Sequence, residues 1–166
     1  MSLVLVRIDN RLIHGQVLEA WVPFVHADCI VVANDEIAGN SLKKMMMEAS
    51  VPSRMRVEIG SVEDAVRLLT SSELSRSQVL LLFGTSSDAV RAFGAGLEYD
   101  RLNLGNMHAD KGKARYSCTL FLNAADLDNL ELLEQAGVKI TSRCIPADGD
   151  RPWRKLIPAK GGMDGV

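Results

Sequence analysis

The apolar residues of this chain follow two alternating patterns along its 166 positions. Short runs rich in valine, isoleucine and leucine predict β-strands, at about 3–8, 28–33, 54–59, 78–83, 101–104, 116–121 and 138–144. Longer stretches with apolar residues three and four positions apart predict α-helices, at about 15–24, 39–50, 61–71, 86–95, 124–136 and, with a weaker pattern, 150–156. Strands that alternate with helices are typical of βαβ units.

The strand pattern narrows the fold class. The runs at 3–8, 28–33 and 78–83 are almost continuously apolar, which is typical of central parallel strands covered on both faces. A closed barrel of eight βα units needs roughly 250 residues, more than this chain has. We therefore expect an α/β fold with an open, mostly parallel, twisted sheet of about seven strands and helices on both faces, its last strand either parallel or antiparallel at an edge.

The length favours one domain. A chain of this size with 47% apolar residues is long enough for one sizeable core and too short for two ordinary domains. We assign residues 1–157 to a single domain. The glycine-rich end at 158–166, PAKGGMDGV, has few apolar residues, so a flexible tail is expected there.

Charge and cysteine content argue against several classes of function. The chain has 19 Lys and Arg against 21 Asp and Glu, a net charge of −2, which gives no global attraction to nucleic acid or to an anionic membrane. The apolar run at 3–6 is shorter than a signal-peptide core or a membrane span, so a cytoplasmic protein is expected. The cysteines, Cys29, Cys118 and Cys144, form no C-x-x-C pair, and neither a disulfide framework nor a metal site is predicted.

Candidate chemistry gathers where the predicted strands end. In an open α/β sheet the ligand crevice lies outside the carboxyl ends of the strands. The segment 7–16 after the first strand reads RIDNRLIHGQ, which brings two arginines, a carboxylate and a histidine together before a helix. A neutral imidazole at His14 is a competent nucleophile, and Asp9 is expected to orient it. Which of its two nitrogens reacts stays open.

The same segment offers groups that would stabilise a phosphoryl group on this histidine. The guanidinium groups of Arg7 and Arg11 have forked N–H donors for phosphoryl oxygens. Gly15 allows close backbone approach at a helix start, where free N–H groups favour an anion. No strand is followed by a G-x-x-x-x-G-K-[ST] or G-x-G-x-x-G motif. A nucleotide-driven kinase and a dinucleotide enzyme therefore have little support, and no cofactor is predicted.

Two further side chains are candidates for a supporting role. Asp35, after the second strand, either projects its carboxylate into the crevice or forms a turn. His108, after the fifth strand, is a supporting donor, a substrate contact or an ordinary loop residue. The basic segment 111–115, KGKAR, is either a solvated loop or a docking patch for an acidic partner.

The segment 7–17, RIDNRLIHGQV, followed by Trp21, closely resembles the active-site signature of one family. This family comprises the IIB components of the mannose/fructose/sorbose branch of the bacterial phosphoenolpyruvate-dependent sugar phosphotransferase system. The resemblance continues in family order at 32–38, 52, 61–65, 102–108, 137–143 and 146. It covers about residues 3–146, while residues 148–153, DGDRPW, match no motif of the family that we can place.

The resemblance implies an open, mostly parallel α/β sheet with the phosphorylated histidine at His14. The residues that it places around this histidine are Arg7, Asp9, Arg11, Gly15 and Gln16. It implies that a phosphorylated IIA protein donates to the histidine, and that the phosphoryl group then moves to a sugar carried through a membrane IIC/IID pair. The chain would dock transiently on the inner face of the membrane through that pair. The implied activity is that of a protein-phosphohistidine–sugar phosphotransferase. Because the sequence begins directly at the first strand, a separate IIB polypeptide is expected.

Two other functions stay open at this point. A regulatory phosphoprotein would use the same histidine without transporting a sugar. A binding module of similar fold would hold a sugar phosphate with the arginines, and His14 would carry no covalent modification. The sequence specifies neither the sugar nor the oligomeric state.

Overall fold

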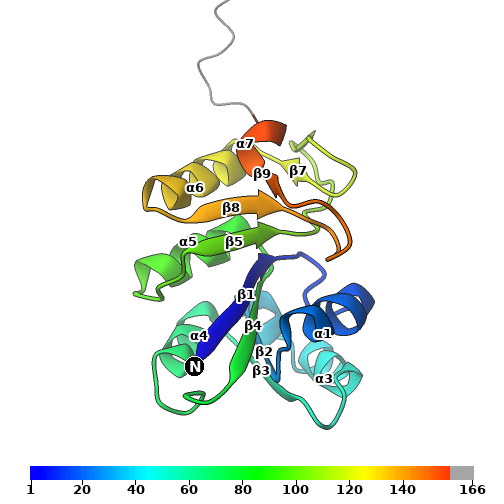
Figure 1. Cartoon of the computed structure of the whole chain (residues 1–166), viewed down its shortest axis with the longest axis vertical. Coiled ribbons are helices and arrows are strands. Elements are labelled where there is room, and N and C mark those ends of the chain that lie inside the picture. Colours follow the sequence, from blue (N-terminus) through cyan, green and yellow to red (C-terminus); the bar gives the residue numbers. More distant parts are fainter. Residues whose placement is uncertain (158–166) are drawn as a thin grey trace, which may run out of the picture.

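The computed structural model describes residues 1–157 of the chain, so the predicted tail at 158–166 lies outside the described residues. Within this part, the main sheet has seven strands in the order β3-β2-β4-β1-β5-β8-β9 (Figure 1). The strands are β1 (Ser2–Ile8), β2 (Cys29–Ala33), β3 (Arg56–Gly60), β4 (Gln78–Phe83), β5 (Arg101–Leu104), β8 (Lys139–Ser142) and β9 (Arg151–Pro152). All neighbouring pairs are parallel except β8 and β9, which are antiparallel at the edge. The expected open, mostly parallel sheet is confirmed.

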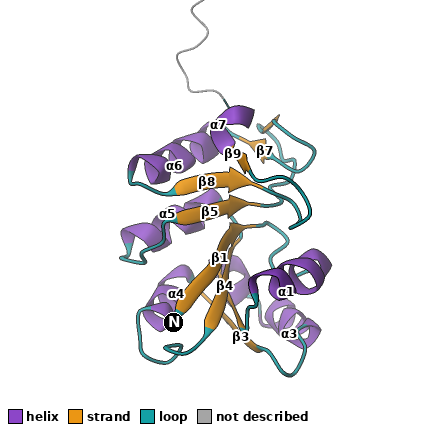
Figure 2. Cartoon of the chain, in the orientation of Figure 1, coloured by secondary structure: helices purple, strands orange, loops and turns teal. Residues whose placement is uncertain are grey.

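Helices cover both faces of this sheet (Figure 2). One face carries a π-helical segment η1 (Val17–Trp21) that continues into α1 (Val22–Val25), together with α2 (Asp35–Ala38) and α3 (Ser41–Ser50). The other face carries α4 (Val62–Leu69), α5 (Ser86–Gly94) and α6 (Ala124–Gln135). A last turn, α7 (Trp153–Leu156), ends the described part.

The two faces have separate apolar clusters, because successive side chains of a strand point to opposite sides. On β2, Val31 packs on the α4–α6 side and Val32 on the η1 side. On β4, Leu81 and Leu82 divide in the same way. Both strands are therefore buried on both faces, which explains their continuous apolar runs in the sequence.

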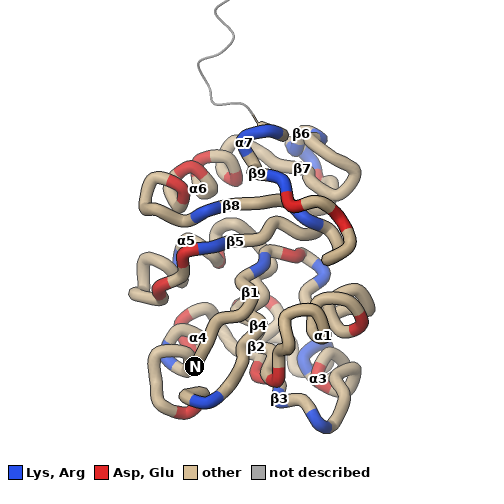
Figure 3. The backbone as a smooth tube through the Cα atoms, viewed as in Figure 1, with Lys and Arg blue, Asp and Glu red and all other residues tan. Residues whose placement is uncertain are grey.

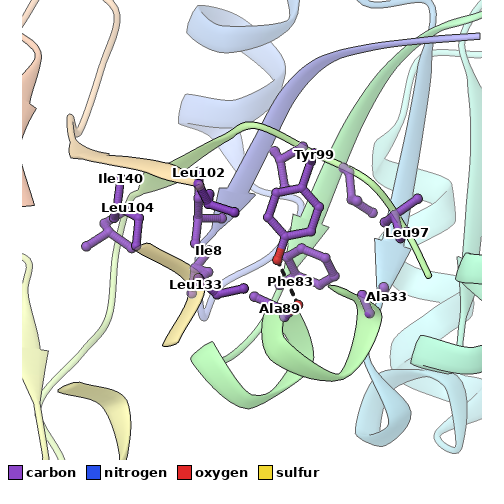
Figure 4. Close-up of a cluster of buried hydrophobic side chains, with 14 of the residues drawn as sticks. Ile8, Ala33, Phe83, Ala89, Leu97, Tyr99, Leu102, Leu104, Leu133 and Ile140 are labelled. Atoms are coloured by element: carbon purple, nitrogen blue, oxygen red, sulfur yellow. Dashed lines mark hydrogen bonds between the residues drawn. The ribbon is translucent and has the colours of Figure 1, made fainter. Parts of the chain in front are cut away.

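An aromatic group fills the larger cluster beneath α5. The hydroxyl of Tyr99 donates to the carbonyl of Ala89 at 2.7 Å (Figure 4). Its ring packs edge-on against Phe93, with centroids 5.4 Å apart, and lies 6.2 Å from the ring of Phe83. Burial raises the pKa of Tyr99, so the hydroxyl stays a donor and fastens the segment before β5 to α5 at neutral pH.

Two of the predicted elements are wrong in the C-terminal third. The strand expected at 116–121 is absent from the main sheet, and the short strands β6 (Ala114–Arg115) and β7 (Phe121–Leu122) pair with each other instead. The carbonyl of Leu120 accepts from the N–H groups of Tyr116 and Ser117, which closes the chain into a turn. The helix expected at 150–156 is split into β9 and α7, because β9 pairs with β8 before the chain turns helical.

The other predicted strands and helices are confirmed with small changes at their ends. The predicted helix at 39–50 corresponds to α3 and is preceded by the separate turn α2. Within residues 1–157, no helix has the length and apolar character that crossing a bilayer requires.

Candidate functional site

The loop that follows β1 lies at the centre of the sheet, where β1 is flanked by β4 and β5. The N–H of Asp9 donates to the carbonyl of Phe83 on β4, and the N–H of Leu12 donates back to the carbonyl of Asp9. Leu12 has a φ of 57°, which is unusual for a leucine. Its side chain is only 3% exposed, so burial in the η1-side cluster holds this left-handed turn in place. The turn folds the chain back and brings His14 over Asp9.

Asp9 is the centre of the site and is fully buried. Its Oδ2 accepts from His14 Nε2 at 2.9 Å, from Arg7 Nη2 at 3.1 Å and from Arg7 Nε at 3.3 Å. Its Oδ1 accepts from the backbone N–H of Arg11 at 3.1 Å. Burial raises the pKa of Asp9, but the hydrogen bond from His14 and the charge of Arg7 outweigh it, and the net pKa lies below its usual value. Asp9 is therefore a carboxylate at neutral pH.

Arg7 is 1% exposed, and all five of its N–H groups have acceptors. Besides the two bonds to Asp9, it donates to the carbonyls of Arg143 at 2.8 Å and Cys144 at 3.1 Å and to the side chain of Asn103. This geometry leaves no N–H for a phosphoryl oxygen. The role predicted for Arg7 therefore changes from a phosphate donor to a support for Asp9.

Two neighbours hold the guanidinium of Arg7 in place. Its Cζ lies 5.0 Å from the ring centroid of Trp21, whose Nε1 donates to the carbonyl of Cys144 at 3.0 Å. Gly105 also lies against the guanidinium, because a Cβ at position 105 would lie 2.2 Å from Cζ of Arg7. Gly105 is thus required because the guanidinium occupies the space of a side chain.

Arg11 is the exposed arginine of the site, with 46% of its side chain accessible. Its Nη2 donates to Oε1 of Gln16 at 3.1 Å, and its Nε lies 3.9 Å from Oδ1 of Asp9. Gly15 and Gln16 are exposed in the first helical turn, and no atom would contact a Cβ at Gly15. The surface beside His14 is therefore open, and Arg11 has donors directed to solvent there.

The charge order of this loop is visible along the backbone. Figure 3 shows two blue segments with a red one between them where β1 leads into the loop, matching the order Arg7, Asp9, Arg11. Only the last of the three is exposed. The charge that a partner meets at this point is therefore positive.

Asp35 does not join the site around His14. Its Oδ1 accepts from the N–H of Val62 at 3.0 Å, and its Oδ2 accepts from Arg91 at 2.9 Å. These bonds lower the pKa of Asp35 and fasten the start of α2 to α4 and α5. The geometry agrees with a turn-forming role, and the hydrogen bonds of this carboxylate go to α4 and α5 rather than to His14.

His108 contacts the loop after β1 through the side chain of Asn10. Asn10 Nδ2 donates to Nδ1 of His108, and Asn10 Oδ1 accepts from Asn106 at 2.6 Å. The N–H of Asn10 also donates to the carbonyl of Asn106 at 2.8 Å. His108 therefore contacts the loop from the β5 side without contacting His14.

Several residues that build the site were missed in the sequence. Asn103, Gly105, Trp21, Arg143 and Cys144 all contact or confine Arg7. A polar residue in the middle of the apolar run at 101–104 is the one local signal, because Asn103 is 6% exposed and needs a partner. Among residues 1–157, no three His, Cys, Asp or Glu side chains gather in a way that would hold a metal ion.

Comparison with known proteins identifies the family of this chain. The sequence matches the model of the family described as PTS system sorbose subfamily IIB component over residues 3–164. It is 32% identical over 156 residues to the N-acetylgalactosamine-specific phosphotransferase enzyme IIB component 2 of Escherichia coli (strain K12), covering 94% of this chain and 99% of that protein. It is 26% identical over 157 residues to the mannose-specific EIIAB component of the same organism, covering 95% of this chain and 49% of that protein.

A solved structure shares the fold. The crystal structure of the IIBSor domain of the sorbose permease from Klebsiella pneumoniae superposes with a TM-score of 0.90 at 28% identity, covering 95% of this chain and 96% of that one. The family match also includes residues 148–153, which the sequence comparison by motif left out. The chain belongs to the sorbose subfamily of IIB components of the phosphotransferase system, a family of phosphotransferases that serve sugar uptake.

Proposed function

We propose that His14 accepts a phosphoryl group on Nδ1 from a phosphorylated IIA protein and passes it to a sugar carried by a membrane IIC/IID complex. The observation that carries this proposal is the contact of 2.9 Å between His14 Nε2 and Asp9 Oδ2. A buried carboxylate accepts a hydrogen bond, so Nε2 holds the proton. The lone pair of the neutral ring is then on Nδ1, which becomes the nucleophilic nitrogen.

The transfer needs positioning and electrostatic stabilisation rather than a cofactor. The lone pair of Nδ1 attacks phosphorus in line, the P–N bond to the donor histidine breaks, and its electron pair returns to the donor ring. The imidazole of His14 gains positive charge as the new bond forms. Asp9 faces that charge from the opposite edge of the ring, because its carboxylate contacts Nε2.

The two arginines have different parts in this proposal. Arg11 supplies exposed N–H donors for the oxygens of the transferring group. Arg7 keeps Asp9 charged and in place through two hydrogen bonds to Oδ2. The exposed turn at Gly15 and Gln16 leaves room for the donor protein and provides backbone N–H groups near the phosphoryl group.

The names of relatives support the proposed partners. The relative named as an EIIAB component supports a IIA protein as the donor, and relatives named for sorbose and N-acetylgalactosamine support a sugar as the acceptor. In this proposal the chain works in the cytoplasm and docks transiently on the membrane complex. A purely regulatory phosphoprotein would share the first step and lack the second.

Intact-mass spectrometry tests the first step. Wild type, His14→Ala and the control His26→Asn are incubated with phosphoenolpyruvate, the general phosphotransferase carriers and a cognate IIA protein at mildly alkaline pH. We expect one acid-labile phosphate on wild type and on the His26 variant, and none on His14→Ala. Asparagine suits the control because position 26 has a φ of 55°. Unmodified wild type in the presence of phosphorylated IIA would contradict the proposal.

Two further measurements test the nitrogen and the acceptor. Nitrogen-15 NMR of the phosphorylated chain distinguishes the two ring nitrogens, and phosphate on Nε2 would refute the assignment from Asp9. Membrane vesicles that contain IIC and IID then separate transport from regulation. Transport predicts that the phosphate leaves His14 when the matching sugar is added, whereas a regulatory protein keeps it.

A further inference from the structure

A cavity opens at the same edge of the sheet as the proposed phosphoryl site. Its volume is about 600 Å³, within the range of roughly 300–1,000 Å³ that is typical of ligand pockets. It lies among the loops after β1, β2, β4 and β5 and the first turns of α5 and α6, and Asn10 and Leu12 of the loop before His14 form part of its wall. His14 does not line it. We call this cavity the rim pocket.

The wall of the rim pocket is rich in amides and hydroxyls. Asn123, Asn129 and Ser87 contribute to it. Asn129 Nδ2 donates to Oγ of Ser86 at 3.0 Å, and that hydroxyl donates to Oδ1 of Asp126 at 2.7 Å. This chain of bonds fixes the orientation of the Asn129 amide and leaves its carbonyl oxygen as an acceptor. Such groups suit a ligand with several hydroxyls, each of which both donates and accepts.

The charges of the wall argue against an anionic ligand. Lys113 Nζ lies 3.3 Å from Asp126, and Lys43 Nζ lies 3.8 Å from Glu36. Both lysines that line the rim pocket are therefore paired with carboxylates, and Asp110 adds a further negative charge. This excess of negative charge would repel a phosphate, whereas it would not repel an uncharged polar molecule. The carboxylates are also good acceptors for hydroxyl groups.

We infer that the rim pocket binds an uncharged monosaccharide. The inference goes beyond the proposed function and rests on it for its biological meaning: the acceptor sugar is carried by the membrane complex, and the rim pocket, which His14 does not line, would sense a sugar of the same class. The pocket is joined to the phosphoryl loop through Asn10, which donates to Nδ1 of His108. That bond places the ring proton of a neutral His108 on Nε2, as a donor in the wall. A bound sugar would contact this pair and the turn at Leu12, so it would restrict the loop that carries His14.

Nuclear magnetic resonance of the unphosphorylated full chain tests the inference. D-Mannose, D-fructose and inorganic phosphate are titrated separately into nitrogen-15-labelled protein. We expect saturable shifts with at least one of the two sugars at millimolar concentration, in the amides of Ser87, Ala125 and the Asn129 side chain. Shifts there with phosphate and with neither sugar would overturn the inference in favour of an anion site. No saturable shift with either sugar would also overturn it.

Matched variants locate the binding. Asn129→Leu and Ser87→Gln are expected to weaken sugar binding about tenfold or more, since each changes a polar group of the wall. Gln135→Leu, another amide-to-leucine change on α6, lies outside the rim pocket and should bind like wild type. Ser87 is exposed at the start of α5, so its variant keeps a test available if Asn129→Leu fails to fold. Equal affinity in Ser87→Gln and wild type would place the sugar elsewhere.

The same variants separate this inference from the proposed function. Each is phosphorylated with IIA and weighed, and each should carry one phosphate, because none contacts His14 or Asp9. Phosphorylation without sugar binding in wild type would refute the rim pocket alone. Sugar binding without phosphorylation would refute the carrier role alone.

Discussion

Replacing Gly105 by alanine tests the internal support of the site. The residue is buried where β5 ends, and its N–H donates to the carbonyl of Ile8 at 2.9 Å. A Cβ there would lie 2.2 Å from Cζ, 2.3 Å from Nη2 and 2.5 Å from Nε of Arg7. The backbone φ of Gly105 is not in the left-handed region, so the effect of the change is steric. The guanidinium must move or β5 must shift.

Neither movement is easy. Arg7 is fixed by five hydrogen bonds to Asp9 in the loop after β1, to Asn103 of β5 and to the segment after β8. Removing one partner of a buried ion pair costs about 3–5 kcal/mol, since the other charge stays buried without compensation. We expect Gly105→Ala to lose about 3 kcal/mol or more of a total stability that is commonly 5–15 kcal/mol. Asp9 would lose its orientation at the same time, so phosphorylation of His14 should slow.

Urea unfolding followed by circular dichroism measures the stability, and rapid-quench phosphorylation by IIA measures the rate. Gly94→Ala is the matched control, because a Cβ at this last residue of α5 contacts nothing within 4 Å. It should be neutral or gain about 0.5–1 kcal/mol from reduced backbone entropy. If Gly105→Ala unfolded within about 0.5 kcal/mol of wild type and accepted phosphate at the same rate, the argument that Arg7 is fixed in place would be refuted.

Three other changes test separate parts of the site. Arg11→Gln should slow phosphorylation by about ten- to a hundredfold. It should leave urea unfolding unchanged, because the side chain is half exposed. A large loss of stability would show a structural role for Arg11 instead. Trp21→Phe should lose about 1–2 kcal/mol in urea, because the donor to Cys144 is removed while an aromatic ring stays over Arg7, and an unchanged unfolding midpoint would contradict this. Asp9→Asn should be less stable than wild type at neutral pH. The folded pKa of Asp9 lies below its ordinary value of 3.8. The stability that the charged Asp9 contributes is therefore present above pH 3.8 and is lost as the pH falls through the folded pKa. A stability difference between wild type and Asp9→Asn that stays constant from about pH 7 to about pH 3 would refute the charged state assigned to Asp9.

The sequence was sufficient to predict the sheet and the loop after β1 that carries the charged residues and His14. Strands β2 and β4 are buried on both faces, so their apolar runs are continuous and easy to recognise. The side chains of Ser61 and Asn123 accept from the N–H of the third helical residue, so α4 and α6 begin close to the positions that the apolar pattern predicts. His14 was singled out because it follows β1 in a loop of charged residues.

The partners of Arg7 could not be predicted, because they lie far away in the sequence. Asn103 is 96 residues from Arg7, and the carbonyls of Arg143 and Cys144 are 136 and 137 residues away. The local sequence shows an arginine close to a carboxylate and suggests that its N–H groups donate to a phosphate. Only the folded sheet shows that the N–H groups of Arg7 already donate to other residues. The strand β9 was missed for a similar reason, since its two residues become a strand only by pairing with β8.

Buried and exposed arginines suit the two demands on a carrier of this kind. In the proposed function the protein meets two partners in succession, so the group that touches the phosphoryl oxygens has to be accessible, and Arg11 is. The proton on Nε2 must stay in place while charge on His14 changes, which requires a carboxylate that solvent does not reach. Asp9 is fully buried and is held by Arg7. If these positions were exchanged, with Arg7 exposed and Arg11 buried, water would compete for Asp9 and either ring nitrogen of His14 could hold the proton. Under the proposed function, the burial of one arginine therefore favours Nδ1 as the reacting nitrogen, and the exposure of the other leaves that nitrogen accessible to a partner.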